Sequence, residues 1–386
     1  MRDTVLVREA TLPQNRADIY RAALEHFLAP VHQQLYIDDN INEVMINGHD
    51  QIYVERSNGT VERIDAVFPS EAALRAAVNN LAQYVDRRLD ERCLSMNARL
   101  PEPERFRVHV IMPPASRSGI VVSIRKFSRV RFTIETLVEK GTISEAAGQF
   151  LKLAIKLHRN MLVSGGTGTG KTSLLNALSG AIPDAERVIV IEDSSELNLT
   201  QPHTIYLESR PPFPDGTGGM TIRDLFVDSL RMRPDRIIVG EVRRGEALDL
   251  VQSMLSGHDG AMSTVHASSP TLALVRLETL SMMSDVNMPV YVARTQVASA
   301  IHLVVQIVRT SHGRLVSDIS EVRGLGPKDQ YEVVSLFNRS RRQTPGGGPA
   351  PLESTGAVSA FADEVIDAGL IDHANLCSEV FGSPKE

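Results

Sequence analysis

Cysteine is scarce in this chain of 386 residues, which has only Cys93 and Cys377, far apart in the sequence. They show neither the paired spacing of a zinc site nor the density of a secreted disulfide scaffold, so a reducing compartment is expected. No uncharged apolar run reaches the roughly 18 residues that a membrane-crossing helix needs, and charged residues interrupt the first nine positions, where a signal peptide would begin. We therefore expect a cytoplasmic protein whose attachment to a membrane depends on partners.

An excess of positive charge is also absent. Lys and Arg total 41 against 47 for Asp and Glu, a formal net charge of −6, and aromatic residues make up only 5%. Such a chain does not hold nucleic acid by bulk charge and has few rings to stack on unpaired bases, so no direct nucleic-acid partner is expected. What is present is a globular composition, with 42% hydrophobic and 23% charged residues and enough length for two or three domains.

Hydrophobic patterning divides the chain into three parts. Residues 1–128 combine short alternating segments with two helical patterns (15–28 and 70–87), which predicts a small α+β domain. Residues 129–340 alternate apolar strands with amphipathic helices, which predicts an α/β domain with a mostly parallel sheet, ending in a small antiparallel meander. Residues 341–386 begin with a segment rich in Gly and Pro and are expected to form a flexible linker and a short helical tail.

A glycine-rich loop carries the strongest chemical signal. It matches G-x-x-x-x-G-K-[ST] and lies directly between a predicted strand and a predicted helix. Small residues let backbone N–H groups surround phosphates, Lys171 can reach the β and γ phosphates, and the Thr172 hydroxyl can bind Mg²⁺. ATP and Mg²⁺ are the predicted ligands, and a glycine-rich turn that binds nothing is the alternative. The candidate nucleotide-binding residues are Gly165, Gly166, Thr167, Gly168, Thr169, Gly170, Lys171, Thr172 and Ser173.

Carboxylates follow two further apolar strands. Glu241 comes after the strand predicted at 237–239, and Glu192 and Glu196 come after the strand predicted at 188–191. In an open α/β sheet, ligands bind outside the carboxyl ends of the strands, so these acids are expected near Lys171. All three are candidate catalytic residues, and Glu192 and Glu241 join Thr172 as candidate metal ligands. Taken singly, each acidic group could be solvated loop charge.

Two histidines flank the strand predicted at 262–265. His258 precedes this strand and His266 ends it, and their spacing fits no common zinc site. His266 could hydrogen-bond to a γ-phosphate, and His258 is a second catalytic candidate, although an ordinary strand-end histidine is the simpler interpretation of either one alone.

Seven arginines, three in the first domain and four flanking the strand before Glu241, could neutralise phosphate charge if two subunits meet at the nucleotide. A solvated surface position is the alternative for each of them. They are Arg105, Arg107, Arg125, Arg231, Arg233, Arg243 and Arg244, of which Arg105, Arg107, Arg125 and Arg231 are the candidate catalytic residues.

The order of these motifs resembles that of the secretion-superfamily ATPases of type II and type IV secretion and pilus assembly. In that family a P-loop is followed by an acidic box, a Walker B strand ending Gly-Glu and a histidine box. The chain is most similar to the CpaF-type ATPases of tight-adherence (Flp) pili over about residues 30–340. The strings that carry this likeness are DDNINEVMING (38–48), ARLP (98–101), SIRKF (123–127), LESRPP (207–212) and LRMRPDRIIVGE (230–241).

The resemblance implies a RecA-like P-loop domain in a homo-hexameric ring that docks on inner-membrane platform proteins. It implies that ATP hydrolysis drives pilus assembly or protein secretion. Glu241 and Glu192 would position the metal and the attacking water, and His266 would sense the γ-phosphate. The arginines of the first domain would contribute positive charge to the nucleotide.

Three other functions stay open. A conjugative or effector type IV secretion ATPase would share every one of these motifs. A regulatory module that binds ATP and scarcely hydrolyses it has no need of a second acidic strand end. A nucleic-acid motor is disfavoured by the charge and the few aromatic residues.

Overall fold

The computed structural model describes residues 21–101, 104–126, 132–212, 216–340, 348–370 and 378–381. The chain divides into two compact units, Met1–Arg129 and Val130–Glu386, and each is described by itself. The sequence predicted a boundary after residue 128, which lies among residues outside the described parts.

The first unit contains a six-stranded antiparallel sheet in the order β3-β2-β1-β6-β5-β4. Alternate residues of its strands, such as Val108 and Ile124, are fully buried in one core with Leu74 and Val78 of the helix. Sequence patterning missed β4, because this polar edge strand lacks a clear apolar alternation. The elements are two short turns (Ala29–Val31, Gln33–Ile37), β1 (Ile41–Asn47), β2 (Ile52–Arg56), β3 (Val61–Ile64), α2 (Glu71–Tyr84), β4 (Ser95–Arg99), β5 (Arg107–Ile111) and β6 (Val121–Arg125).

The second unit is built on one nine-stranded sheet in the order β15-β14-β13-β12-β7-β11-β10-β8-β9. The strands from β12 to β9 run parallel, and β13, β14 and β15 add an antiparallel extension. The predicted meander therefore continues the main sheet, because β12 pairs in parallel with β7. The strands are β7 (Met161–Gly165), β8 (Val188–Glu192), β9 (Thr204–Glu208), β10 (Arg236–Val239), β11 (Met262–Val265), β12 (Leu303–Thr310), β13 (Gly313–Leu325), β14 (Tyr331–Arg339) and β15 (Leu352–Ser354).

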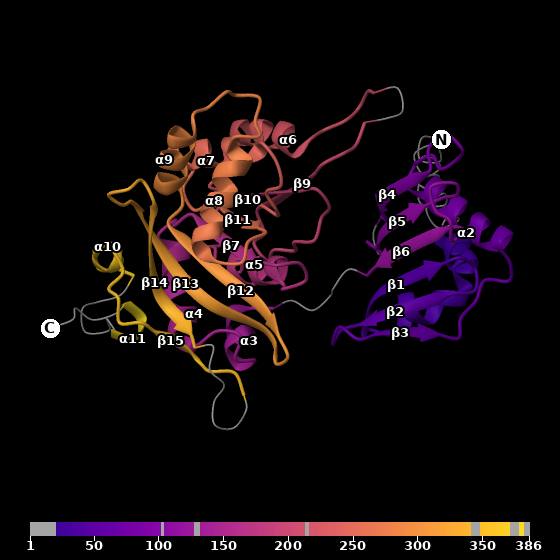
Figure 1. Cartoon of the computed structure of the whole chain (residues 1–386), viewed down its shortest axis with the longest axis horizontal. Coiled ribbons are helices and arrows are strands. Elements are labelled where there is room, and N and C mark those ends of the chain that lie inside the picture. Colours follow the sequence, from indigo (N-terminus) through magenta and orange to yellow (C-terminus); the bar gives the residue numbers. More distant parts are fainter. Residues whose placement is uncertain are drawn as a thin grey trace, which may run out of the picture. The chain divides into compact units, whose positions relative to one another are not determined.

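Helices cover both faces of this sheet (Figure 1). Successive residues of the central strands are buried because both faces are covered; Leu162 faces one core and Val163 the other. One face carries α3 (Ile134–Glu139), α4 (Glu145–Lys156), α5 (Lys171–Ser179), α10 (Ala362–Asp367) and α11 (Ser378–Phe381). The other carries α6 (Ile222–Ser229), the 3₁₀ turn η3 (Leu230–Met232), α7 (Glu246–Leu255), α8 (Pro270–Ser281) and α9 (Val290–Ala300). The predicted fold class, a mostly parallel α/β domain after a smaller α+β domain, is confirmed.

The chain beyond residue 340 contains short helices, α10 and α11, as expected, but it also contains β15 and packs onto the second unit, which were not expected. Residues 341–347 and 371–377 lie outside the described parts, but β15 pairs with β14, and Phe361 and Phe381 pack with Phe150 of α4. These large apolar side chains are buried, so the segment belongs to the core of the second unit. Sequence patterning missed it because its apolar residues are few and separated by glycine and polar residues.

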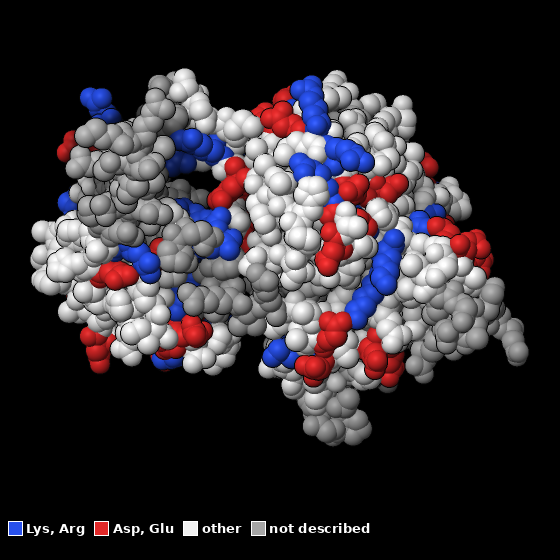
Figure 2. Space-filling view, turned by 180° about the vertical axis from the view of Figure 1, so that it is seen from behind, with Lys and Arg blue, Asp and Glu red and all other residues white. Residues whose placement is uncertain are grey.

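Two surface properties bear on partners. No helix in the described parts combines the length and the apolarity that crossing a bilayer requires. In the space-filling view, acidic and basic side chains are interspersed over the visible face of the second unit (Figure 2). That face therefore shows no continuous basic stripe of the kind that tracks a nucleic-acid backbone.

Candidate active site

The glycine-rich loop joins β7 to α5 in a tight curl. Gly168 and Gly170 have φ angles of +68° and +90°, which favour glycine. A Cβ on Gly165 would lie 2.5 Å from the Ile307 carbonyl oxygen and 2.6 Å from the Thr169 hydroxyl oxygen. The loop therefore needs glycine at these positions, and it leads directly into the first turn of α5, whose free N–H groups favour an anion. Thr167 and Ser173 are exposed beside it.

Lys171 begins α5 and turns back over the loop. Its ammonium group donates to the Gly166 carbonyl at 2.9 Å and lies 3.3 and 3.4 Å from the two ring nitrogens of His266. Burial lowers the pKa of Lys171, while Glu241 and Glu196 oppose that shift. A desolvated ammonium at the mouth of a glycine loop is a strong partner for a phosphate that replaces these contacts.

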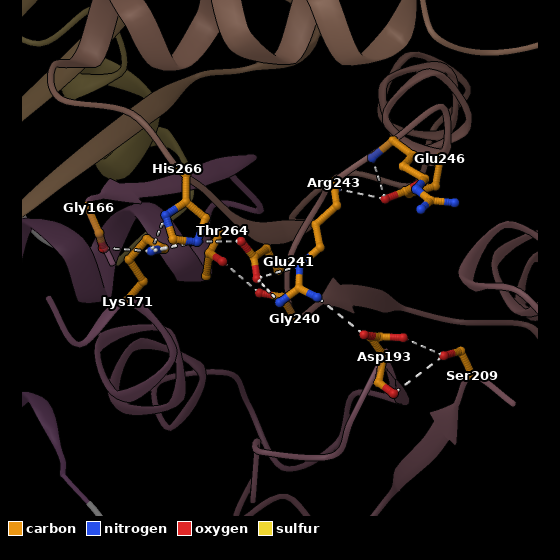
Figure 3. A network of polar contacts seen from close by, with 11 residues as sticks. Gly166, Lys171, Asp193, Ser209, Gly240, Glu241, Arg243, Glu246, Thr264 and His266 are labelled. Carbon is orange, nitrogen blue, oxygen red and sulfur yellow. Dashed lines mark hydrogen bonds and ion pairs between the residues drawn. The ribbon is translucent and has the colours of Figure 1, made fainter. Parts of the chain in front are cut away.

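Glu241 lies two residues beyond β10 and links the other charged groups (Figure 3). Its carboxylate is 2.7 Å from Nε2 of His266 and 2.6 Å from a guanidinium nitrogen of Arg243. Burial and the nearby Lys171 lower the pKa of His266, so its ring is neutral near pH 7. A neutral ring can accept a hydrogen bond from Lys171, and its Nε2 lies in close contact with the Glu241 carboxylate. The cation, the imidazole and the carboxylate form one connected chain.

Backbone contacts hold the turn that carries Glu241. The Gly240 N–H donates to the Ile191 carbonyl at 2.9 Å, and the Thr264 hydroxyl donates to the Gly240 carbonyl at 2.8 Å. These bonds come from the strands on either side of β10. The carboxyl ends of β8, β10 and β11 are thus fixed to one another, as the strand-end argument predicted.

Glu192, the last residue of β8, and Glu196, in the loop that follows, lie in different environments. Glu192 is 4% exposed, and its carboxylate accepts hydrogen bonds from the backbone N–H groups of Glu196 and Leu197. It packs against Gly240, where a Cβ would lie 2.9 Å from its Cγ. Burial raises the pKa of Glu192 to about 7. Glu196, by contrast, is exposed and acts electrostatically on Lys171. The Glu192 carboxylate holds the loop in this structure, and metal binding by Glu192 stays a prediction.

Arg243 extends the site toward the edge of the sheet. Besides Glu241 it contacts Asp193 at 3.2 Å, and Asp193 accepts a hydrogen bond of 2.8 Å from the Ser209 hydroxyl (Figure 3). The sequence offered Arg243 as one of several arginines that could neutralise phosphate charge, and within this chain it contacts Glu241 and Asp193. Sequence reasoning gave Ser209 no role, because it follows β9, a strand that patterning missed.

Two predicted catalytic residues lie at the opposite edge of the sheet. His258 precedes β11, so this strand separates it from His266. Arg231 lies in η3, before the start of β10, while Glu241 follows the end of that strand. Proximity along the chain suggested a shared site, but a strand delivers its two ends to opposite edges. A contribution of Arg231 to a neighbouring subunit stays a prediction.

The three arginines of the first unit are near one another there. Arg107 and Arg125 are cross-strand partners on β5 and β6, and Arg105 precedes β5 with a φ of +53°. Arg125 also lies 3.4 Å from Glu43 of β1. Their approach to a nucleotide stays a prediction.

The donor set at this edge suits ATP with Mg²⁺. In the described parts of the chain, no group of three or more His, Cys, Asp or Glu side chains could hold a metal alone. Mg²⁺ usually keeps several waters and is bound by one or two protein oxygens together with substrate phosphates. The Thr172 hydroxyl on the first turn of α5 and the Glu241 carboxylate are the oxygens that fit that role.

Comparison with known proteins gives a consistent assignment. The model of the family described as "Type II/IV secretion system protein" matches residues 27–333. The type IV secretion system protein PtlH of Bordetella pertussis is 34% identical over 315 residues, covering 75% of this chain and 91% of PtlH. A putative conjugal transfer protein of Mycobacterium tuberculosis is 32% identical over 318 residues, covering 81% and 89%.

Solved structures support the fold alone. The ATPase DotB of Legionella pneumophila and the pilus retraction motor PilT with bound ADP each give a TM-score of 0.52 at 16% identity, with 81% of this chain and 82% of theirs covered. The family match spans both units and all the strand-end motifs. This chain belongs to the type II/IV secretion system protein family.

Proposed function

We propose that the chain is an ATPase whose hydrolysis cycle powers a type II/IV secretion machine. The observation that carries the proposal is the contact chain from Lys171 through His266 to Glu241 beside a glycine-rich phosphate loop. A protein that only binds a nucleotide needs the loop and the lysine. It does not need a carboxylate connected to them at a neighbouring strand end.

In the proposed mechanism, Lys171 leaves the Gly166 carbonyl and pairs with the β and γ phosphates. Thr172 and Glu241 would hold Mg²⁺, which when bound would neutralise phosphate charge. Glu196 and Glu241 orient the attacking water, and Glu192 acts indirectly by fixing the loop that carries Glu196. His266 is held between Lys171 and Glu241, so it exchanges partners when a γ-phosphate draws Lys171 away.

The assembly is proposed to be a homo-hexamer at the cytoplasmic side of the inner membrane, attached through platform proteins. Arg105, Arg107 and Arg125 would bring positive charge to the nucleotide in that ring. The motif strings favour pilus assembly of the tight-adherence type. The names of the relatives, which include conjugal transfer and type IV secretion proteins, favour conjugative or effector secretion as the second candidate. Loss of surface pili or loss of conjugal transfer in a cell carrying Lys171→Ala distinguishes the two.

Direct nucleotide binding and steady-state turnover test the ATPase proposal. Lys171→Ala removes the phosphate cation, so nucleotide affinity falls at least about 10-fold. Glu241→Gln leaves the loop intact but removes the charged carboxylate, so affinity stays within about threefold while turnover falls about 100-fold or more. Equal slow turnover in the wild type and both variants would instead support a nucleotide-gated regulatory module.

A further inference from the structure

The β12–β13 hairpin extends beyond the carboxyl edge of the parallel sheet. Strand β12 pairs with β7 as far as Ile307 opposite Gly165, where the glycine-rich loop begins. Its last residues continue to Thr310, and β13 returns from Gly313. The hairpin tip therefore stands beside the loop.

Two arginines on this tip face the loop. Arg309 and Arg314 are directly opposed cross-strand partners, so their side chains leave the same face of the hairpin. The Arg314 side chain donates from Nε to the Gly168 carbonyl at 3.2 Å. The site of a Cβ on Gly170 lies 2.9 Å from Cδ of Arg314, and that of a Cβ on Gly168 lies 3.8 Å from a guanidinium nitrogen of Arg309.

The positive charge of this pair is not neutralised by nearby acids. In the described parts of the chain, neither guanidinium has an Asp or Glu oxygen within 4.0 Å. Like charges directly opposed across two strands are destabilising. An anionic group between or above Arg309 and Arg314 would offset that repulsion.

The strand order indicates which part of a nucleotide lies near the pair. Glu241 and His266 follow β10 and β11, on one side of β7, so the reacting end of a phosphate chain lies on that side. Strand β12 flanks β7 on the other side. A nucleotide whose γ-phosphate points toward Glu241 therefore directs its nucleoside toward the hairpin.

We propose that Arg309 and Arg314 form the subsite for the nucleoside end of the nucleotide, a role that rests on the proposed function. A guanidinium is planar, so it can stack on a base while its charge attracts the phosphate next to the ribose. The two arginines contribute affinity for the part of the ligand that does not react. They therefore affect nucleotide binding and KM.

Calorimetric binding of ADP and of inorganic pyrophosphate tests this subsite. Pyrophosphate has no nucleoside, so it fills only the phosphate loop. In Arg309→Ala/Arg314→Ala we expect ADP affinity to fall about 10-fold or more and pyrophosphate affinity to fall clearly less, because pyrophosphate gains only from the charge of the pair and not from stacking. Lys328 lies in the exposed turn between β13 and β14. Lys328→Ala removes a positive charge away from the hairpin tip and is therefore the matched control.

Each other outcome has a defined meaning. Equal losses of ADP and pyrophosphate affinity would show that the arginines only hold the loop in shape, and no loss of ADP affinity would also overturn the subsite. Arg309→Gln alone separates the subsite from folding, because the Arg309 side chain makes no hydrogen bond to the described residues, and this variant too must weaken ADP binding selectively. Undiminished ADP binding by Lys171→Ala would instead overturn the proposed function itself.

Discussion

Strand β10 has an arginine near each end, and the two have opposite characters. Arg236, at its start, is 1% exposed and donates to Glu186 at 2.5 Å and to the Ile155 carbonyl at 2.7 Å. Arg243, beyond its carboxyl end, contacts Glu241 and Asp193 with about half of its side chain exposed.

The two edges of the parallel sheet differ in the same way, in how far their charged side chains are exposed to solvent. At the amino edge, the charge of Arg236 is desolvated, so losing a partner leaves it unpaired at a high cost in free energy. At the carboxyl edge, contacts of Arg243 reach solvent and can be exchanged when a ligand arrives. Ion pairs at the amino edge therefore stabilise the fold, whereas those at the carboxyl edge can be replaced by contacts to a ligand.

Breaking the buried pair should have the largest effect on stability. In Arg236→Met the Glu186 carboxylate loses its guanidinium partner and keeps only the His158 contact at 3.3 Å, so the free energy of unfolding, measured by urea denaturation, is expected to fall by about 3 kcal/mol. Nucleotide affinity of the folded protein should not change. Adding Glu186→Gln should restore part of the stability. A large loss of affinity with unchanged stability would reverse the roles of the two edges.

Measuring the stability of a Glu192 variant at several pH values tests whether burial or position at the sheet edge decides how a charged group behaves. Glu192 lies at the same edge as Arg243, but its side chain is buried. Burial raises its pKa to about 7 from 4.5, so between these pH values the folded chain binds more protons than the unfolded chain. This group therefore makes the free energy of unfolding fall as pH rises through that window. Glu192→Gln, which resembles the protonated form, should gain about 1–3 kcal/mol over the wild type between pH 5 and pH 8.

The exposed Glu332→Gln is the control for that series and should show no such gain. A gain that is the same at pH 5 and pH 8 would mean that Glu192 is not protonated in the folded protein at pH 5.

The smallest expected difference between the two edges is in the effect of histidine substitutions on turnover. His266→Ala removes the link between Lys171 and Glu241, so turnover is expected to fall about 10-fold, which is about 1.4 kcal/mol. His258→Ala alters the amino edge and should change turnover by less than about twofold. Equal losses in steady-state assays would place both histidines in the mechanism and contradict their separation by β11.

The positions of Lys171, Glu241 and His266 could be predicted because each follows a strand whose apolar residues are visible in the sequence. Parallel strands bring their carboxyl ends to one edge whatever the loops between them do. The use of Glu192 could not be predicted, because its carboxylate folds back onto the amides of the same loop.

The pairing of β12 with β7 also could not be predicted from the sequence. The sequence indicates a strand at 302–309, but the choice of neighbour depends on packing across the whole sheet. Arg309 and Arg314 could not be placed beside the glycine-rich loop without it. The different placement of His258 follows from the same cause, since closeness in sequence hides the length of the strand in between.

The pairing of β15 along β14 has a practical consequence for anyone who shortens this protein. Ending the chain near residue 340, where the recognisable motifs stop, would uncover the hydrogen-bonding edge of β14 and the aromatic surface around Phe150. Such a fragment would keep every nucleotide-facing residue of the second unit and still tend to aggregate. Residues as far as Phe381 should be kept in any minimal version.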